Sequence, residues 1–71
     1  MKFFFYYNKN ADRNGLHEIH TKGCLHSPYI RNQEPIGYFY TCKEAINQAK
    51  RLNPTLKFDG CKYCNSRFHK G

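Results

Sequence analysis

The sequence predicts a small α+β domain: a three-stranded antiparallel sheet, one helix over about residues 42–52, and a C-terminal C-x2-C zinc knuckle. One segment combines a capping sequence with an apolar stripe at helical spacing. Cys61 and Cys64 have the spacing of a metal-binding cysteine pair. Aromatic or alternating segments typical of strands occur at residues 2–7, 16–20 and 36–40.

The chain is short for a domain stabilised only by a hydrophobic core. With 71 residues it should form a single domain, residues 1–71, and a domain of this size buries only about 60% of its unfolded surface. Such domains often need a metal ion or disulfides. The four cysteines could supply either, and they can pair into two disulfides in three ways.

The N-terminal segment does not have the pattern of a secretory signal peptide. Residues 3–7 are all aromatic, which is too short for the apolar core of a signal peptide, and no small-residue cleavage site follows. The sequence contains no transmembrane run. We therefore expect a cytoplasmic protein without a membrane partner, in which the thiols stay reduced and bind metal.

The first two strands are expected to form a hairpin. Residues 2–7 place Phe4 and Tyr6 on one face and the odd-numbered aromatics on the other. Asn14-Gly15 is a strong hairpin dipeptide. Residues 16–20 alternate apolar and polar side chains, so His20 should lie on the face opposite Ile19.

The middle of the chain is expected to contain a loop and then the third strand. Residues 25–35 hold two prolines and no clear period, which indicates an irregular loop of roughly ten residues. Residues 36–40 resume strand character and should complete the sheet.

The helix has a start signal and a stop signal. Thr41 and Glu44 form a capping box, and Asn53-Pro54 ends the helical pattern. After the helix, we expect Asp59 to lie in a turn and the tail from Asn65 to Gly71 to be partly frayed. The apolar stripe of the helix consists of Cys42, Ala45, Ile46, Ala49 and Leu52.

Two short motifs together provide a complete set of metal ligands. His20 and Cys24 form an H-x3-C, and with the C-x2-C they supply one imidazole and three thiolates, a closed set used for one structural zinc. Gly23 and Gly60 each precede a proposed cysteine ligand, where a sharp turn can require positive φ. The proposed ligands are His20, Cys24, Cys61 and Cys64.

Other cysteine and histidine residues leave alternatives open. Cys42 is either a buried core residue or, near the helix N-terminus, a reactive thiolate or replacement ligand. His17 is three residues from His20, an odd offset that places the two on opposite faces of a strand. His26 and His69 are spare ligand candidates.

The charge favours an anionic partner. The 12 Lys and Arg residues outnumber the 5 Asp and Glu residues, which gives a net charge of +7. This excess favours nucleic acid or an acidic protein surface, although charge alone indicates non-specific attraction. Phosphate contacts combined with base stacking are expected from Lys43, Lys50, Arg51, Lys62, Tyr63 and Arg67.

The order of these motifs resembles the metal-binding domain of Ada-type DNA-repair proteins and small stand-alone bacterial proteins, often from mobile elements or phage, whose role is not known. The resemblance covers roughly residues 16–64 and implies a small α+β fold with one structural zinc and, in some members, binding to the DNA backbone. The matching positions are His20 and Cys24, Tyr38-Phe39-Tyr40, Thr41-Cys42-Lys43-Glu44-Ala45 and Gly60-Cys61-Lys62-Tyr63-Cys64.

The chain also departs from this family. The family's alkyl-accepting cysteine corresponds to His20, so that activity does not carry over. The arginine-rich extension that accompanies DNA binding in the full-length repair protein is absent, and the loop between the ligand pairs is longer.

We therefore expect a non-enzymatic zinc-binding module that contacts nucleic acid or protein and has no small-molecule substrate. Neither a Gly-rich phosphate loop nor a serine elbow occurs in the sequence. The alternatives are a thiol-reactive redox or alkylation sensor, a metal-free protein of mobile-element or phage origin that acts through protein binding, and a disulfide-stapled secreted peptide.

Overall fold

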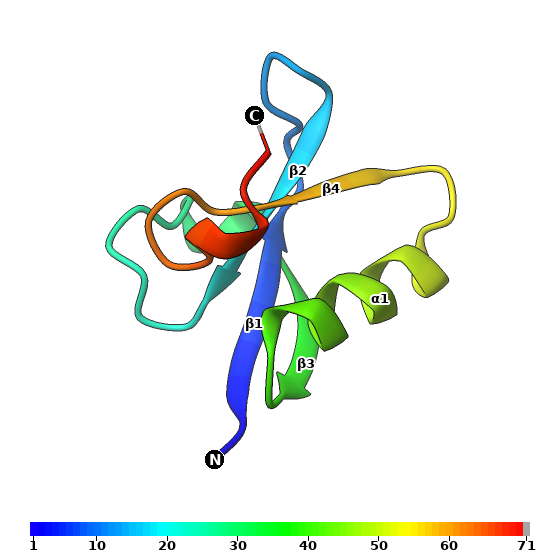
Figure 1. Cartoon of the computed structure of the whole chain (residues 1–71). Helices are drawn as coiled ribbons and strands as arrows, with labels where there is room; N and C mark the ends of the chain where they lie inside the picture. The colour runs from blue at the N-terminus through cyan, green and yellow to red at the C-terminus, as the bar shows by residue number, and fades with distance from the viewer. Residues whose placement is uncertain (71) are drawn as a thin grey trace.

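A computed structural model describes residues 1–70 and has the expected α+β class with one helix (Figure 1). Two short 3-10 helices accompany the main elements. In chain order the elements are β1 (Phe3–Asn8), β2 (Leu16–Thr21), η1 (Ile30–Asn32), β3 (Gln33–Phe39), α1 (Cys42–Leu52), β4 (Lys57–Gly60) and η2 (Ser66–Phe68).

The sheet has four strands in the order β3-β1-β2-β4, so the expectation of three antiparallel strands is wrong. β1 is antiparallel to both β2 and β3, as expected, but β4 pairs in parallel with β2. The four residues of β4 show no strand pattern by themselves. Their extended conformation depends on pairing with a strand some 40 residues earlier, and Asp59 therefore lies in a strand and not in a turn.

The hairpin of β1 and β2 is confirmed, with Tyr6 opposite His20. Its loop is held mainly by Asp12, whose side-chain oxygen accepts hydrogen bonds from the backbone amides of Asn14 and Leu16. Gly15 has φ of 78°, which only glycine adopts at low cost.

The third strand begins at Gln33 and not at residue 36, because pairing with Asn8, Tyr7 and Tyr6 extends it toward the N-terminus. Pro35 is tolerated there because β3 is an edge strand, and the register shifts between Phe5 and Tyr6. The preceding loop is correspondingly shorter and contains η1.

The hydrophobic core lies between the sheet and α1, which covers one face (Figure 1). The helix begins at its predicted capping box, with Thr41 Oγ1 accepting from the Glu44 amide at 3.3 Å. Leu52, expected on the apolar stripe, is 61% exposed because it lies on the last turn. The buried core residues are Phe5, Tyr7, Ile19, Cys42, Ala45, Ala49 and Phe58.

The tail is docked as far as Lys70, so the expectation that it frays is wrong for residues 65–70; Gly71 lies outside the described residues. Asn65 is buried, and the Lys70 amide donates to Asp59 Oδ1 at 2.6 Å. His69 Nδ1 lies 3.0 Å from the Gly60 carbonyl oxygen and 3.2 Å from Asp59 Oδ2. These contacts attach the tail to β4.

Candidate metal centre

The predicted ligands meet because β2 and β4 run in the same direction. Ile19 is the register partner of Gly60, so the residues that follow each strand emerge at the same end of the sheet. His20 is in β2, and Cys61 directly follows β4. A 3.0 Å hydrogen bond from the Cys61 amide to the Ile19 carbonyl oxygen continues the pairing to the first cysteine of the C-x2-C.

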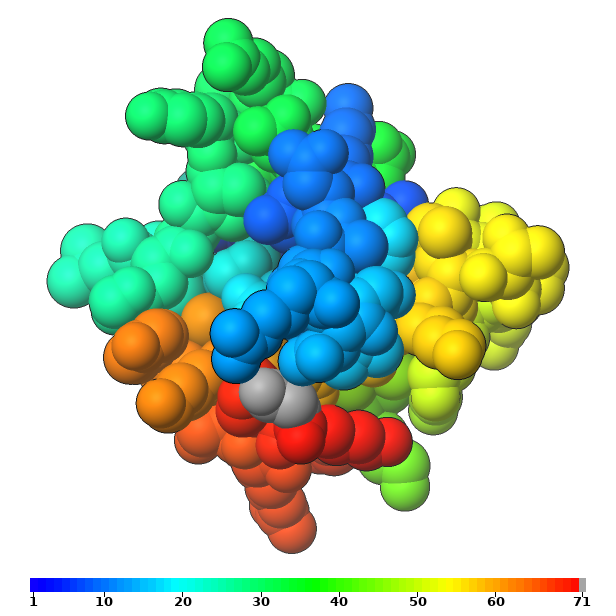
Figure 2. Space-filling view, turned by 90° about the horizontal axis from the view of Figure 1, so that it is seen from above, coloured from blue at the N-terminus to red at the C-terminus, as the bar shows by residue number. Residues whose placement is uncertain are grey.

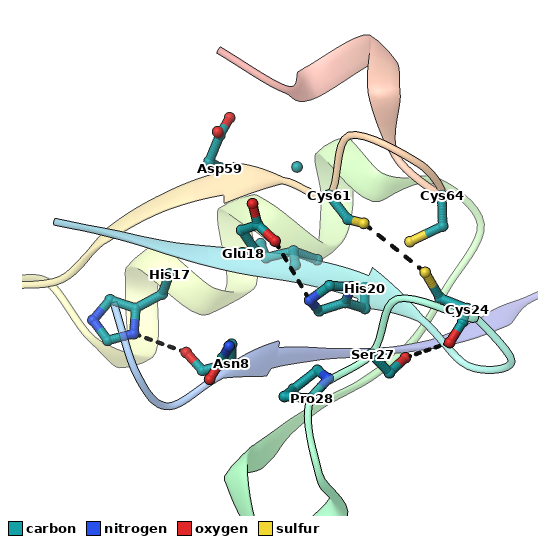
Figure 3. A network of polar contacts seen from close by, with 12 residues as sticks. Asn8, His17, Glu18, His20, Cys24, Ser27, Pro28, Asp59, Cys61 and Cys64 are labelled. Atoms are coloured by element: carbon teal, nitrogen blue, oxygen red, sulfur yellow. Dashed lines mark hydrogen bonds and ion pairs between the residues drawn. The ribbon is translucent and has the colours of Figure 1, made fainter. Parts of the chain in front are cut away.

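One candidate ligand atom from each of His20, Cys24, Cys61 and Cys64 lies within 4.8 Å of the other three, and this group could hold a metal ion. The sulfurs of Cys24 and Cys61 are 3.9 Å apart, and all four cysteines of the chain are free thiols. Figure 3 shows the three sulfurs gathered at one end of the His20 ring. His20 and Cys61 are each only 1% exposed.

His20 has one ring nitrogen with a neighbour and one without. Nε2 is 3.8 Å from Glu18 Oε1 (Figure 3). Nδ1 is buried and has no hydrogen-bond partner among residues 1–70. The ring is stacked on Tyr6, with centroids 5.7 Å apart. Burial lowers the pKa of His20, and the charge of His26 lowers it further, which favours the neutral imidazole that a metal requires.

Cys64 receives hydrogen bonds from its surroundings. The Thr21 amide is 3.4 Å from its sulfur, and Asn65 Nδ2 is 3.5 Å from it. Burial raises the pKa of the Cys64 thiol, the hydrogen bond from the Thr21 amide lowers it, and the neighbouring Cys24 and Cys61 raise it. Both N–H groups are suited to stabilising a metal-bound thiolate.

Asn65 and Glu18 contact the ligand residues but were not predicted from the sequence. Asn65 Nδ2 also donates to the Ile19 carbonyl oxygen at 3.0 Å, joining the C-x2-C to β2. Its position directly after Cys64 is the only sequence signal that it carried. Glu18 could have been noticed because strand alternation places it on the His20 face.

The two glycines beside the cysteines have different roles. Gly23 has φ of 93°, as expected for a sharp turn before Cys24. Gly60 does not have positive φ, so that part of the expectation is wrong. Gly60 is needed for space, because a Cβ there would lie 2.5 Å from the Asn65 carbonyl oxygen.

The alternative ligands are not part of the four-residue group. Cys42 is buried in the core, and burial raises its pKa to about 11, which disfavours the thiolate form at neutral pH. His17 Nδ1 is 2.9 Å from the Asn8 carbonyl oxygen, and His69 contacts Gly60 and Asp59. His26 stacks on Tyr63 with centroids 3.6 Å apart. Among residues 1–70, only the four proposed ligands form a group of this kind.

The six residues expected to contact nucleic acid are all exposed. Lys43, Lys50 and Arg51 lie on α1, whereas the other three lie in the C-terminal segment. Lys62 Nζ is 5.9 Å from the centroid of the Tyr63 ring. Among residues 1–70, no side-chain hydrogen bond, ion pair or ring contact joins the helical group to the C-terminal group.

No helix within residues 1–70 is both long enough and apolar enough to cross a membrane. Comparison with protein-family models, curated proteins and solved structures found no match to this chain.

Proposed function

We propose that the protein is a non-enzymatic, zinc-binding interaction module, with one structural zinc held by His20, Cys24, Cys61 and Cys64. The observation that carries this proposal is the close grouping of one imidazole and three free thiols at one end of the sheet. A mixed sulfur and imidazole set favours zinc over harder cations.

The residues fit a zinc ion. Ligands about 2.3 Å from a tetrahedral centre place neighbouring sulfurs about 3.8 Å apart, close to the 3.9 Å between Cys24 and Cys61. The partnerless Nδ1 of His20 would gain a partner on metal binding, while Nε2 faces Glu18. Such an arrangement, with a carboxylate at the second nitrogen, is common for histidine ligands.

A set of four protein ligands supports a structural role. Catalytic zinc sites keep one position for water or substrate, whereas His20 and the three cysteines fill a tetrahedron. The metal would join β2 to the C-terminal segment, which otherwise depends on a small core. The chain would then be one metal-stapled domain, residues 1–71.

The distribution of charge supports an anionic partner. Within residues 1–70, Lys9 is the only Lys or Arg whose side chain forms an ion pair, at 3.8 Å from Glu34. Three other acidic side chains have internal roles: Glu44 caps α1, Asp12 holds the hairpin loop and Asp59 binds the tail. The remaining cations are free to attract phosphates, which favours nucleic acid over a neutral partner.

The resemblance to Ada-type metal-binding domains agrees with this proposal at the ligand positions. Because His20 occupies the position of the alkyl acceptor, the proposed role is binding and not repair. A cytoplasmic location would keep the thiols reduced.

The test is the native mass of the purified full chain, measured beside its denatured mass without added metal. We expect an increment of one zinc ion and four reduced cysteines. A bare native mass for a folded, reduced protein would overturn the zinc proposal, and a mass four hydrogens below the reduced chain would indicate two disulfides.

Matched variants assign the ligands. Cys24→Ser should lose the zinc increment, whereas Cys42→Ala should keep it, because Cys42 lies in the core and outside the ligand group. Retention of full zinc affinity by Cys24→Ser would exclude Cys24 as a ligand.

A further inference from the structure

The sheet face opposite α1 carries a half-buried aromatic side chain on β1, Phe4, and an exposed one on β3, Tyr38. Phe5 lies in the core and Phe39 packs against it. Phe4 and Tyr38 project from the opposite face of the sheet. Phe4 and Tyr38 are register partners with ring centroids 5.0 Å apart. Tyr38 is 63% exposed. A large aromatic ring is thus left available on an open sheet.

A groove of about 290 Å³ adjoins this aromatic pair. Tyr6 lines the groove but is itself buried, and its hydroxyl is hydrogen-bonded to Ser27. Ile30 also lines the groove and is 84% exposed, and the segment near residue 30 stands out from the body of the molecule (Figure 2). The groove is lined by Phe4, Tyr6, Lys22, Ile30, Gln33 and Tyr38.

The surroundings of the groove are cationic. Lys22 lines it, is exposed, and forms no ion pair in the described part of the chain. Arg31, next to Ile30, has its guanidinium carbon 5.6 Å from the centroid of the Tyr29 ring. None of the described residues that line the groove carries a carboxylate, and Glu34, the acidic residue of β3, is paired with Lys9. Exposed rings and unpaired cations therefore occur together.

We infer that this face binds single-stranded nucleic acid, with bases stacked on Tyr38 and Phe4 and phosphates contacting Lys22 and Arg31. This inference rests on the proposed interaction with an anionic partner. An open aromatic platform accepts the flat face of an unpaired base, which a duplex keeps stacked inside, and nearby cations neutralise the backbone.

This face is better suited to base stacking than the surface around Tyr63, which the sequence predicted to contact nucleic acid. Tyr63 already has His26 stacked against its ring at a centroid distance of 3.6 Å, so one of its faces is covered. Lys43, Lys50 and Arg51 lie on α1, on the other side of the sheet from Tyr38. Tyr63 and Lys50 therefore provide matched controls.

The test is fluorescence anisotropy of the zinc-loaded full chain with a labelled single-stranded DNA or RNA oligonucleotide of mixed sequence. Tyr38→Ala should weaken binding about tenfold, as expected for loss of one stacked base, and Tyr38→Phe should bind like the wild type. Lys22→Gln should weaken binding and reduce its salt dependence. Tyr63→Ala and Lys50→Gln should change affinity less than twofold.

The inference would be overturned by no binding of the wild-type protein, by equal losses for Tyr38→Ala and Tyr63→Ala, or by equally tight binding of a glutamate-rich peptide that also depends on Tyr38. Zinc content and circular dichroism, measured on the same samples, show whether each variant is folded. A zinc-loaded protein that binds the oligonucleotide through Tyr63 and Lys50 would retain the proposed function and overturn only this surface.

Discussion

Gly60 and the backbone of Asn65 are so close that a single added methyl group would not fit between them. A Cβ on Gly60 would lie 2.5 Å from the Asn65 carbonyl oxygen and 2.9 Å from Cβ of Phe68. The turn that carries Cys61 and Cys64 is therefore folded back directly over the end of β4. This contact positions the second half of the candidate metal centre.

Gly60→Ala should consequently be strongly destabilising, by about 3 kcal/mol, because backbone atoms must move to relieve the overlap. Gly15→Ala is the matched control: it has nothing within 4 Å of an added Cβ and is strained only by its φ of 78°. It should cost about 1 kcal/mol. Urea unfolding of both variants measures the difference, and equal costs would contradict the close approach.

Removing the metal should unfold much of the chain. Binding energy at a structural zinc site contributes directly to folding in small domains, and this core contains only a few large apolar side chains. Addition of a strong chelator should abolish the helical circular dichroism signal, and added zinc should restore it. An unchanged spectrum after verified zinc removal would show that the core alone maintains the fold.

Glu18→Gln should weaken zinc binding about tenfold without abolishing it, since the carboxylate faces Nε2 of His20 and would orient the ring. Glu34→Gln changes charge in the same way on β3, where the carboxylate pairs with Lys9, and should leave zinc affinity unchanged. Competition with a chromophoric chelator measures both affinities. Equal affinities for the two variants would remove Glu18 from the site.

Cys42 should make stability fall at alkaline pH. Burial raises its pKa from about 9 to about 11, so the folded state retains a proton that the unfolded state releases. Its contribution is complete below pH 9 and is lost progressively as the pH rises to about 11. The zinc-loaded wild type should therefore lose more stability between pH 9 and 11 than Cys42→Ala, as measured by urea unfolding.

The same burial should protect Cys42 from alkylation at neutral pH. Iodoacetamide should label it far more slowly than a free thiol in the folded protein, and at an ordinary rate after unfolding. Rapid labelling of Cys42 in the intact fold would instead favour the thiol-reactive sensor.

Several features could be predicted from the sequence because their signals are local. Thr41 and Glu44 indicated the start of α1, alternation placed His20 opposite Ile19, and the spacing of the cysteines indicated a ligand pair. Each signal lies within one turn of helix, one strand or one loop. Local propensity is sufficient for elements of this kind.

Other features were decided only by tertiary structure. β4 is a strand because it pairs with β2, residues 65–70 are docked because Asp59 accepts a hydrogen bond from the Lys70 amide, and Asn65 reaches the Ile19 carbonyl oxygen 46 residues away. Residue type and spacing determined which side chains could bind a metal. The parallel pairing of two distant strands brings these side chains together. The sequence does not predict this pairing, because hydrogen bonds between segments so far apart leave no periodic pattern in it.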